Sequence, residues 1–506
     1  MTNNRNINGA TSDVIDAFTE TVRRYPGRPA IVHHGQDLSY RQLHEMAGHL
    51  AERIGTAPGV VAVPAVHTPD TVVGLLGILA AGGTYCPVDP AFPPQRQQEM
   101  LTAAGCRTTL GLDPELRPAP AGLPRLAETA RGGAGEPGPQ PPAYLLFTSG
   151  STGQPKPVVT PRRAISATVD SLRTLFGLTA GDRVLQFASL NWDTCFEEIL
   201  PALTTGAALV LDREAHSGSF PRFLRLVERE RITVLDLPTA FWHELVLHLA
   251  EEGGALPGCV RLLVIGGEAA NPARLADWAA LDTGRIRLLN TYGSTETTLI
   301  THAVDLHGPL AAGRDRPWAP GDRVPIGRAL PHVLERIDER GELLIGGPAV
   351  ALGYLGLPEA TAARFTEDAE GVRWFRTGDR VSRAPDGALT HQGRMDGELK
   401  VRGIRVDLAE VEAHLGGHPG VQAAAVTGAS LAGRSALVAY LVPRAGADTA
   451  TLAAEVRGYL RDRLPGHLVP SRITVVPELV LTASGKVDRA ASHRRHGAAA
   501  PAPARS

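Results

Sequence analysis

The sequence predicts an α/β protein with a large N-terminal domain of layered helices and strands, followed by a small C-terminal domain. Short apolar runs alternate with helical patterns along most of the chain, which is typical of buried strands in layered α/β folds. The pattern starts again at about residue 396 and continues to about residue 492. The chain has 506 residues, of which 43% are hydrophobic, so both parts are long enough to form a core.

The first predicted helix covers residues 12–24. Its apolar residues recur at helical spacing, and we expect the polar pair Thr11 and Ser12 to cap it. Five later runs predict buried strands, with helical segments between them. The runs are RVLQFA (183–188), AALVL (207–211), ITVLDL (232–237), RLLVIG (261–266) and IRLLN (286–290). Active sites of such sheets lie at the carboxyl ends of the strands, so we expect functional side chains there.

The C-terminal part repeats this alternation on a smaller scale. Far earlier in the chain, within the large domain, residues 115–142 contain too many prolines and glycines to pack in a core, so they predict an exposed loop or linker. The small domain is predicted from three apolar runs and the helical segment at 451–464. The runs are VQAAAVTG (421–428), SALVAYLVP (435–443) and SRITVVPEL (471–479). The tail at 494–506 is predicted to be disordered.

Composition excludes several classes of function. The 51 basic and 53 acidic residues nearly cancel, so no basic surface for nucleic acid is indicated. No signal peptide and no apolar run long enough to span a bilayer is visible, so we expect a cytoplasmic protein and no membrane partner. The four cysteines and 17 histidines form no metal-binding pattern, which argues against a structural metal.

A loop rich in glycine and hydroxyl groups follows the apolar run at 143–147. Glycines let backbone amides turn toward an anion, hydroxyls donate hydrogen bonds and a lysine adds a positive charge. The pattern matches neither the Walker loop nor the dinucleotide-binding turn, yet its chemistry predicts a phosphate site. The residues are Thr148, Ser149, Gly150, Ser151, Thr152, Gly153 and Lys156.

This loop, FTSGSTGQPK (147–156), resembles the signature of the adenylate-forming superfamily, and more closely that of the adenylation domains of nonribosomal peptide synthesis. Further motifs in the family order are LSYRQL (38–43), GILAAGGTYCPVDP (77–90), NTYGSTETT (290–298), GELLIGGPAVALGY (341–354), FRTGD (375–379), GRMDGELKVRGIRVDLAEVE (393–412), LPGHLVP (464–470) and SGKVDR (484–489). The resemblance implies a large domain at 1–394, a small mobile α+β domain at 395–493, and a hinge at Asp396 between them.

The resemblance also implies a reaction. A carboxylate attacks the α-phosphate of ATP, gives an acyl-adenylate and pyrophosphate, and a nucleophile then takes the acyl group. Lys486 corresponds to the catalytic lysine, Thr295 would contact the α-phosphate, and Glu296 would bind Mg²⁺. The glycine-rich loop would hold the pyrophosphate. Residues implied at the nucleoside and its surroundings are Gly267, Asn290, Thr291, Tyr292, Asp379 and Arg394, with Asp379 accepting the ribose hydroxyls.

Some positions depart from the family pattern. None removes a charge that the chemistry needs, but those after Asp396 leave the acceptor of the acyl group open. The departures are Pro157 and Ala409 for glycine, Ser294 for proline, Leu352 for arginine and Glu398 for glutamine.

Alignment through the motifs places the specificity positions of the family on Asp193, Thr194, Glu197, Asp236, Val264, Gly266, Thr291, Leu299 and Ile300, completed by Lys486. In amino-acid-activating relatives an aspartate at the first position binds the substrate ammonium, so Asp193 implies an amino acid. Glu198 corresponds to a position that is acidic across the family and is interpreted as structural.

Two further acids lie in apolar surroundings. Asp236 ends an apolar strand, and Glu197 follows Asp193 by one helical turn, so both would be costly to bury without a cation. A substrate with a second cation would remove this cost, and the set is similar to the pattern of β-lysine activation; ornithine, lysine, arginine and cyclic arginine derivatives stay open. Alternatively, an arginine of residues 220–231 neutralises one of the acids.

The acceptor is not determined by these residues. No condensation motif and no carrier segment are visible, so we expect a stand-alone enzyme that passes the acyl group to a separate carrier protein or directly to an amine, with a small activator protein as a possible partner. A CoA ligase and a catalytically inactive nucleotide-binding scaffold are the alternatives. The acids at 193, 197 and 236 argue against the ligase, and intact Lys486, Glu296 and Asp379 against the scaffold.

Overall fold

A computed structural model describes residues 12–111, 125–127, 141–148, 155–311, 316–319, 321–395, 399–401, 404–431, 434–480 and 487–497. The chain divides into two compact units. The first contains Met1–Asp89, Leu101–Leu146 and Pro157–Met395, and the second contains Pro90–Met100, Phe147–Lys156 and Asp396–Ser506. No helix within the described ranges is long and apolar enough to cross a membrane.

A nine-stranded sheet forms the centre of the first unit, in the order β15-β14-β13-β12-β11-β9-β10-β1-β2. Its inner strands from β1 to β13 are parallel, and β2, β14 and β15 pair antiparallel. The strands are β1 (Pro29–His33), β2 (Gln36–Ser39), β9 (Arg183–Leu185), β10 (Ala208–Leu211), β11 (Val234–Pro238), β12 (Leu262–Gly266), β13 (Arg287–Gly293), β14 (Ile300–His307) and β15 (Arg328–Ala329). All five predicted buried strands are present, although β9 is shorter than predicted.

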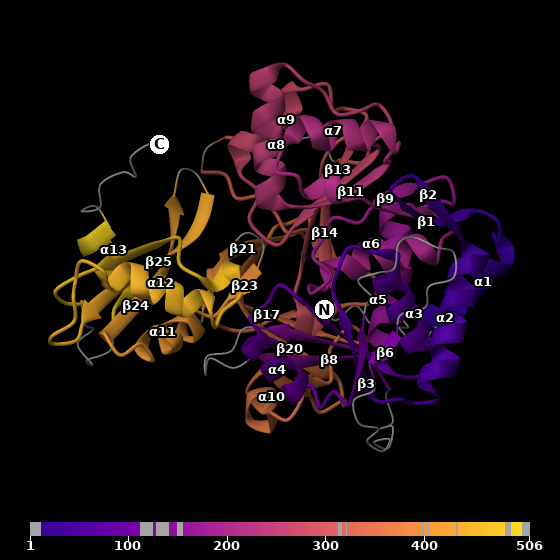
Figure 1. The fold of residues 1–506 in the computed structure, drawn as a ribbon. Coiled ribbons are helices and arrows are strands. Elements are labelled where there is room, and N and C mark those ends of the chain that lie inside the picture. The colour runs from indigo at the N-terminus through magenta and orange to yellow at the C-terminus, as the bar shows by residue number, and fades with distance from the viewer. Residues whose placement is uncertain are drawn as a thin grey trace. The chain divides into compact units, whose positions relative to one another are not determined.

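Helices cover both faces of this sheet, and the side chains of β12 show which helix covers which face. Val264 packs in one core with side chains of α6 (Thr194–Leu203), whereas its neighbours Leu263 and Ile265 pack in another with side chains of α8 (Thr239–Glu252) and α9 (Pro272–Ala280). This is the alternation of a strand that is buried on both sides. Figure 1 shows α8 and α9 together beside β11 and β13.

The remaining helices of this unit are α1 (Val14–Arg24), α2 (Tyr40–Ile54), α3 (Pro69–Ala80), α5 (Arg162–Phe176), α7 (Phe220–Arg229) and α10 (Pro358–Arg364). Helix α4 (Pro94–Ala103) has most of its length in the second unit. The predicted first helix is thus confirmed as α1, but its cap is wrong: Asp13 caps it by accepting a hydrogen bond from the amide of Ile15, in place of Thr11 or Ser12.

Two smaller sheets complete the large part of the molecule. The first has the order β18-β8-β7-β4-β3-β5-β6 and consists of β3 (Val60–Pro64), β4 (Thr84–Val88), β5 (Thr108–Gly111), β6 (Arg125–Ala127), β7 (Pro142–Thr148), β8 (Lys156–Pro161) and β18 (Gly353–Tyr354). The second has the order β16-β17-β20-β19, with β21 paired to β20. Its strands are β16 (Leu334–Ile337), β17 (Glu342–Gly346), β19 (Phe365–Glu367), β20 (Arg373–Arg383) and β21 (Leu389–Arg394).

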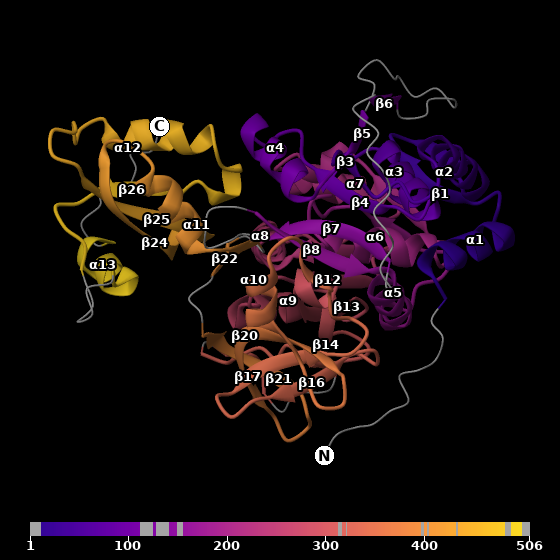
Figure 2. The same cartoon turned by 90° about the horizontal axis from the view of Figure 1, so that it is seen from below.

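The C-terminal part of the second unit has an α+β core, which confirms the predicted fold class. Its three-stranded sheet has the order β24-β25-β26, and alternate residues of β25 pack on opposite faces. Leu437 and Leu441 pack with α11 and α12, whereas the Tyr440 hydroxyl contacts His493 of α13. Figure 2 shows α12 and α13 on opposite sides of β24 and β25. The elements are β22 (Leu399–Val401), β23 (Ile404–Val406), α11 (Leu408–Gly416), β24 (Val421–Leu431), β25 (Arg434–Pro443), α12 (Leu452–Arg461), β26 (Arg472–Val475) and α13 (Arg489–His496).

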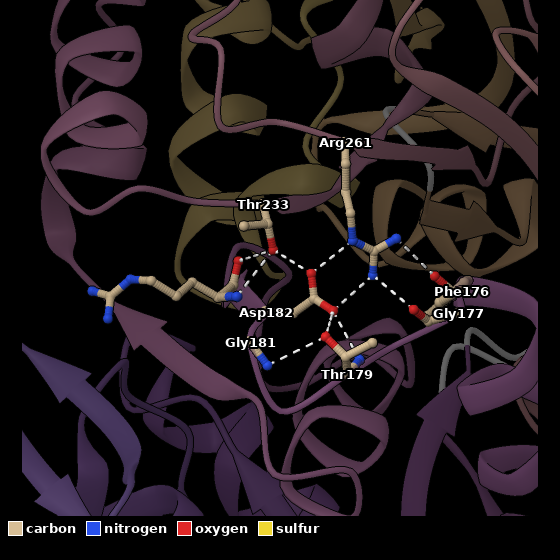
Figure 3. A network of polar contacts seen from close by, with 8 residues as sticks. Phe176, Gly177, Thr179, Gly181, Asp182, Thr233 and Arg261 are labelled. Carbon is tan, nitrogen blue, oxygen red and sulfur yellow. Dashed lines mark hydrogen bonds and ion pairs between the residues drawn. The ribbon is translucent and has the colours of Figure 1, made fainter.

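A polar network ties together the amino ends of three strands of the large sheet (Figure 3). Asp182, Thr233 and Arg261 come directly before β9, β11 and β12. The Asp182 carboxylate accepts hydrogen bonds from Arg261 at 2.7 and 2.9 Å and from the Thr233 hydroxyl at 2.7 Å. Arg261 also donates to the carbonyls of Phe176 and Gly177 at the end of α5. The network holds together the amino ends of these strands, which lie opposite to their carboxyl ends.

Candidate functional site

The carboxyl ends of β11, β12 and β13 bring several predicted substrate residues to one face of the sheet. Asp236 pairs in register with Val264, and the next residues along that face are Gly266 and Thr291. A Cβ atom at Gly266 would lie 2.5 Å from the Thr291 hydroxyl oxygen, and this hydroxyl donates to the carbonyl of Ile265 at 3.0 Å. Only glycine fits at position 266 with this arrangement.

Helix α6 lies over this face and carries the acids of the segment NWDTCFEE. Asp193 is its N-cap residue, half-buried Thr194 its first residue and Glu197 belongs to its first turn. The positive end of the helix dipole favours negative charge at this end. Because Asp193 and Glu197 are four residues apart, they lie on the same side of the helix, as their spacing predicts.

Glu197 and Asp236 form a buried acidic pair. Their exposed fractions are 7% and 6%, and the two carboxyl groups lie close enough for each to influence the ionisation of the other. Burial raises the pKa of Asp236 to about 7. Burial, followed by the charges of Asp236 and Asp193, raises the pKa of Glu197 well above its ordinary value. At neutral pH the free pair therefore retains a proton, because two ionised carboxylates would repel each other in this environment.

No cation within the described part of the chain neutralises this pair. Oδ2 of Asp236 is buried and has no hydrogen-bond partner among the described residues. Arg229, from the segment considered as an alternative, binds Asp212, Glu214 and Glu230. The ion pairs of the described residues therefore do not support an arginine as the partner of the acids.

Glu198, the third acid, has a different environment. Its carboxylate accepts hydrogen bonds from the amides of Phe187 and Ala188 at 2.9 and 3.0 Å and from the side chain of Gln186 at 3.0 Å. Burial raises its pKa, while these donors lower it, and the net effect is upward. Its oxygens are used to hold the segment after β9 against α6, which is a structural role.

The predicted substrate residue Leu299 belongs to a strained turn, and Ile300 follows directly after it. Thr298 and Leu299 have φ of 56° and 66°, a left-handed conformation that β-branched and bulky residues rarely adopt. The Thr298 hydroxyl donates to the carbonyl of Ala349 at 2.7 Å, which helps to hold the turn. A Cβ atom at Gly293 would lie 1.8 Å from the Leu299 carbonyl oxygen, so the close approach requires glycine. Strain of this kind occurs at binding sites.

Glu296 lies in a single turn of 3₁₀ helix at Thr295–Thr297 and is 1% exposed. Ser294 caps the turn, since its backbone amide donates to the Thr297 hydroxyl at 3.2 Å. A proline here, as in the family pattern, would lack that donor. One carboxylate oxygen of Glu296 accepts from the Tyr354 hydroxyl at 2.8 Å. Carboxylate oxygens are of the hard type that Mg²⁺ prefers, so the residue type fits an ion held by one carboxylate and by substrate phosphates.

Among the described residues, no group of three or more histidines, cysteines or acids could form an all-protein metal site.

Asp379, the predicted ribose-binding residue, lies on β20 and is held from both oxygens. Oδ2 accepts from the Tyr292 hydroxyl at 2.6 Å, while Oδ1 contacts Arg394 Nη1 and His391 Nε2, each at 3.0 Å. The structure therefore brings together three predicted nucleotide residues and adds His391, which the sequence reasoning missed.

The adenine position is predicted beside Asn290, which is 4% exposed. Its side-chain amide donates to the carbonyl of Pro325 at 2.8 Å, while Oδ1 is buried without a hydrogen-bond partner among the described residues. An acceptor of this kind suits the exocyclic amine of adenine. Gly267, directly after β12, has φ of 84°, a conformation that glycine adopts easily.

Several predicted residues cannot be placed. Thr148 ends β7 and Lys156 begins β8. The residues between them that were predicted to bind phosphate, Ser149, Gly150, Ser151, Thr152 and Gly153, lie outside the described residues, as do Asp396, Glu398, Lys486 and most of the loop at 115–142. Their roles stay predictions. The predicted disordered tail at 494–506 is wrong at its start, because α13 continues to His496 and so passes the predicted end of the small domain at 493; the residues after 497 lie outside the described part.

Sequence reasoning also missed Tyr354. It belongs to the motif GELLIGGPAVALGY, which was recognised as a whole but without a role for the tyrosine. The contact of its hydroxyl with Glu296 joins residues that are far apart in the chain, so no local sequence pattern indicates it.

Comparison with known proteins identifies the family. The family model "AMP-binding enzyme" matches residues 18–355, and "AMP-binding enzyme C-terminal domain" matches residues 410–486. An isonitrile lipopeptide synthase of Streptomyces coeruleorubidus is 40% identical over 515 residues, covering 95% of this chain and 33% of that protein. The chain thus spans about a third of that relative's length.

Two solved structures have the same fold. One is PA1221, a nonribosomal peptide synthetase protein with adenylation and PCP domains, with a TM-score of 0.79 and 27% identity over 96% of this chain and 84% of that chain. The other is the amide bond synthetase McbA of Marinactinospora thermotolerans, with a TM-score of 0.78 and 25% identity over 95% and 98%. The chain belongs to the AMP-binding enzymes, the adenylate-forming ligases that use ATP with Mg²⁺ and include the adenylation domains of nonribosomal peptide synthetases.

Proposed function

We propose that this chain activates a basic amino acid, with β-lysine as the best candidate, as its aminoacyl-adenylate. The observation that carries the proposal is the buried pair Glu197 and Asp236, which has no cationic partner among the described residues. A carboxylate buried without a cation is costly, and the raised pKa of Asp236 reflects that cost. An ammonium group of the substrate would remove it.

The three acids would bind two different amino groups of the substrate, one close to the reacting carboxyl group and one far from it. Asp193, at the amino end of α6, would bind the amino group near that carboxyl. Glu197 and Asp236 would bind the second amino group at the far end of a long, thin side chain, with the small residue Gly266 at the same face. Each contact offers up to about 4 kcal/mol of Coulomb energy at about 4 Å and an effective dielectric of about 20, before desolvation. This selects against neutral side chains.

In the reaction, a carboxylate oxygen of the amino acid forms a bond to the α-phosphorus of ATP, and the bond to the oxygen that leads to the β-phosphate breaks. Pyrophosphate leaves with the electron pair. Mg²⁺, bound by Glu296 and the phosphates, would neutralise charge on those oxygens. Asp379, Tyr292 and Asn290 would orient the nucleoside, and Lys486 would neutralise charge at the carboxylate and α-phosphate, as the resemblance implies.

The acceptor of the aminoacyl group is the second part of the proposal. We favour the phosphopantetheine thiol of a separate carrier protein, because relatives such as PA1221 combine adenylation and PCP domains. Direct transfer to an amine is the alternative, and its support is the likeness to the amide bond synthetase McbA. A rotation of the small domain about Asp396 would exchange the two half-reactions, and a small activator protein stays a predicted partner. The sequence predicts that this takes place in the cytoplasm.

Amino-acid-dependent pyrophosphate exchange tests the substrate. The panel contains β-lysine, lysine, ornithine, arginine, leucine and an aryl acid, with ATP and Mg²⁺ in every reaction. We expect exchange with the basic amino acids, strongest with β-lysine. Exchange with the aryl acid or leucine alone would overturn the assignment of the acids, and ATP binding without exchange by any acid would favour the inactive scaffold. Product analysis with a carrier protein, free amines or CoA then identifies the acceptor.

A further inference from the structure

His391 makes a contact that the family resemblance did not assign. It lies on β21, and its Nε2 is 3.0 Å from Oδ1 of Asp379. The side chain of His391 is 34% exposed and that of Asp379 is 9% exposed. Because a carboxylate only accepts hydrogen bonds when ionised, the ring nitrogen in this contact carries the hydrogen.

The local backbone explains how His391 reaches the same carboxylate as Arg394. Residues three apart on a regular strand point to opposite faces. Here the pairing of β20 with β21 shifts register between Arg380 and Val381, and Gly393 has φ of 122°. Such irregularities bend a strand and redirect a side chain. The shift allows both donors to face Asp379.

We propose that His391 is a positioning residue that fixes the Asp379 carboxylate for the ribose of ATP, and so contributes to selection for ribose over deoxyribose. This rests on the proposed role of Asp379 as the acceptor of the ribose hydroxyls. Tyr292 donates to one carboxylate oxygen of Asp379, and Arg394 and His391 contact the other. Held at both ends, it cannot rotate freely, and a preorganised acceptor loses less freedom when ligand binds.

The neighbouring residue provides a matched control. Gln392 directs its side-chain amide to the Ser382 hydroxyl at 2.6 Å, away from Asp379. The variant Gln392→Ala therefore alters the same strand without touching the carboxylate. The variant His391→Gln is the conservative test, because the glutamine amide can donate a hydrogen bond from nearly the position of Nε2. His391→Leu removes the donor while retaining an apolar side chain.

The experiment measures binding of ATP, 2′-deoxyATP and 3′-deoxyATP to the full chain by calorimetry, without amino acid. We expect His391→Leu to weaken ATP binding about tenfold and to reduce the preference for ATP over both deoxynucleotides by a similar factor, the loss that one charge-assisted hydrogen bond gives. His391→Gln should stay within about threefold of wild type, and Gln392→Ala should be unchanged.

Two results would overturn the role of His391. The first is an unchanged affinity of His391→Leu for ATP, and the second is an equal loss for ATP and both deoxynucleotides, which a general structural defect would give. Amino acid selection is measured separately by pyrophosphate exchange. A wild-type protein that prefers ATP over its deoxy forms but activates no basic amino acid would overturn the proposed substrate and leave the role of His391 intact.

Discussion

The variant Asp236→Asn tests the acidic pair from two directions. Asparagine has nearly the same shape but no charge, so it removes the attraction for a substrate ammonium and also the cost of a buried carboxylate. The pKa of Asp236 is raised from 3.8 to about 7. At 1.36 kcal/mol for each pKa unit, ionising this group in the empty protein costs roughly 4 kcal/mol. A substrate cation that restores this charge can recover a large part of that energy.

We therefore expect kcat/KM for β-lysine to fall roughly a hundredfold in Asp236→Asn, which corresponds to a loss of about 3 kcal/mol of transition-state stabilisation. The KM for ATP should stay unchanged. Glu197→Gln should behave in the same direction. The assay is pyrophosphate exchange with β-lysine over a range of ATP concentrations. Exchange at the wild-type level in both variants would refute the assignment of the far-end site.

The same substitution should affect stability in the opposite direction. A carboxyl group with a raised folded pKa stabilises the protein below its unfolded pKa, and this contribution disappears as pH rises through about 7. At pH 8 without substrate, Asp236→Asn should therefore unfold at a higher temperature than wild type. If Asp236 had a purely structural role, the Asp236→Asn variant would lose activity and stability together. A lower melting temperature of this variant at pH 8 would therefore contradict the reasoning.

The other predictions concern four further tests. The KM for a basic amino acid should fall between pH 6 and pH 8, because ionisation of Asp236 creates the partner of an ammonium that stays charged, and Asp236→Asn should flatten this profile. Lys486→Ala should abolish adenylate formation far more than transfer from preformed adenylate; equal losses would contradict its role. Asp182→Ala should lower the free energy of unfolding by about 2–4 kcal/mol in urea titrations, because it leaves Arg261 and other donors without their acceptor, while substrate KM values stay unchanged. Glu198→Gln should reduce stability rather than change substrate preference, which thermal unfolding and the exchange panel would distinguish.

Sequence patterns predicted the parts of the fold that depend on periodicity. The five apolar runs became β9 to β13 because buried parallel strands are continuously apolar. The spacing of Asp193 and Glu197 predicted their shared helix face. The cap of α1 was wrong by one residue or more, since Asp13 was an equally suitable neighbour of Thr11 and Ser12. Such choices depend on where the helix starts, which periodicity does not fix.

Contacts between distant strands were not predictable in the same way. His391 reaches Asp379 only because the pairing of β20 and β21 shifts register. The left-handed turn at Thr298 and Leu299 breaks a local preference and depends on contacts with residues far along the chain. The proximity of Glu197 to Asp236 followed from alignment to a family, whereas the absence of a cationic partner among the described residues required the structure.

The network of Asp182, Thr233 and Arg261 has a consequence for how this protein can change over evolution. It anchors the amino ends of β9, β11 and β12, whereas the side chains that we propose to select the substrate lie toward the opposite ends of β11 and β12. Rigidity and selectivity are thus encoded at separate places on the same strands. We therefore expect substitutions at positions 236 and 264 to change which acid is activated while the scaffold keeps its shape. The carboxyl ends of β11 and β12 are then the place to begin directed evolution of new substrates.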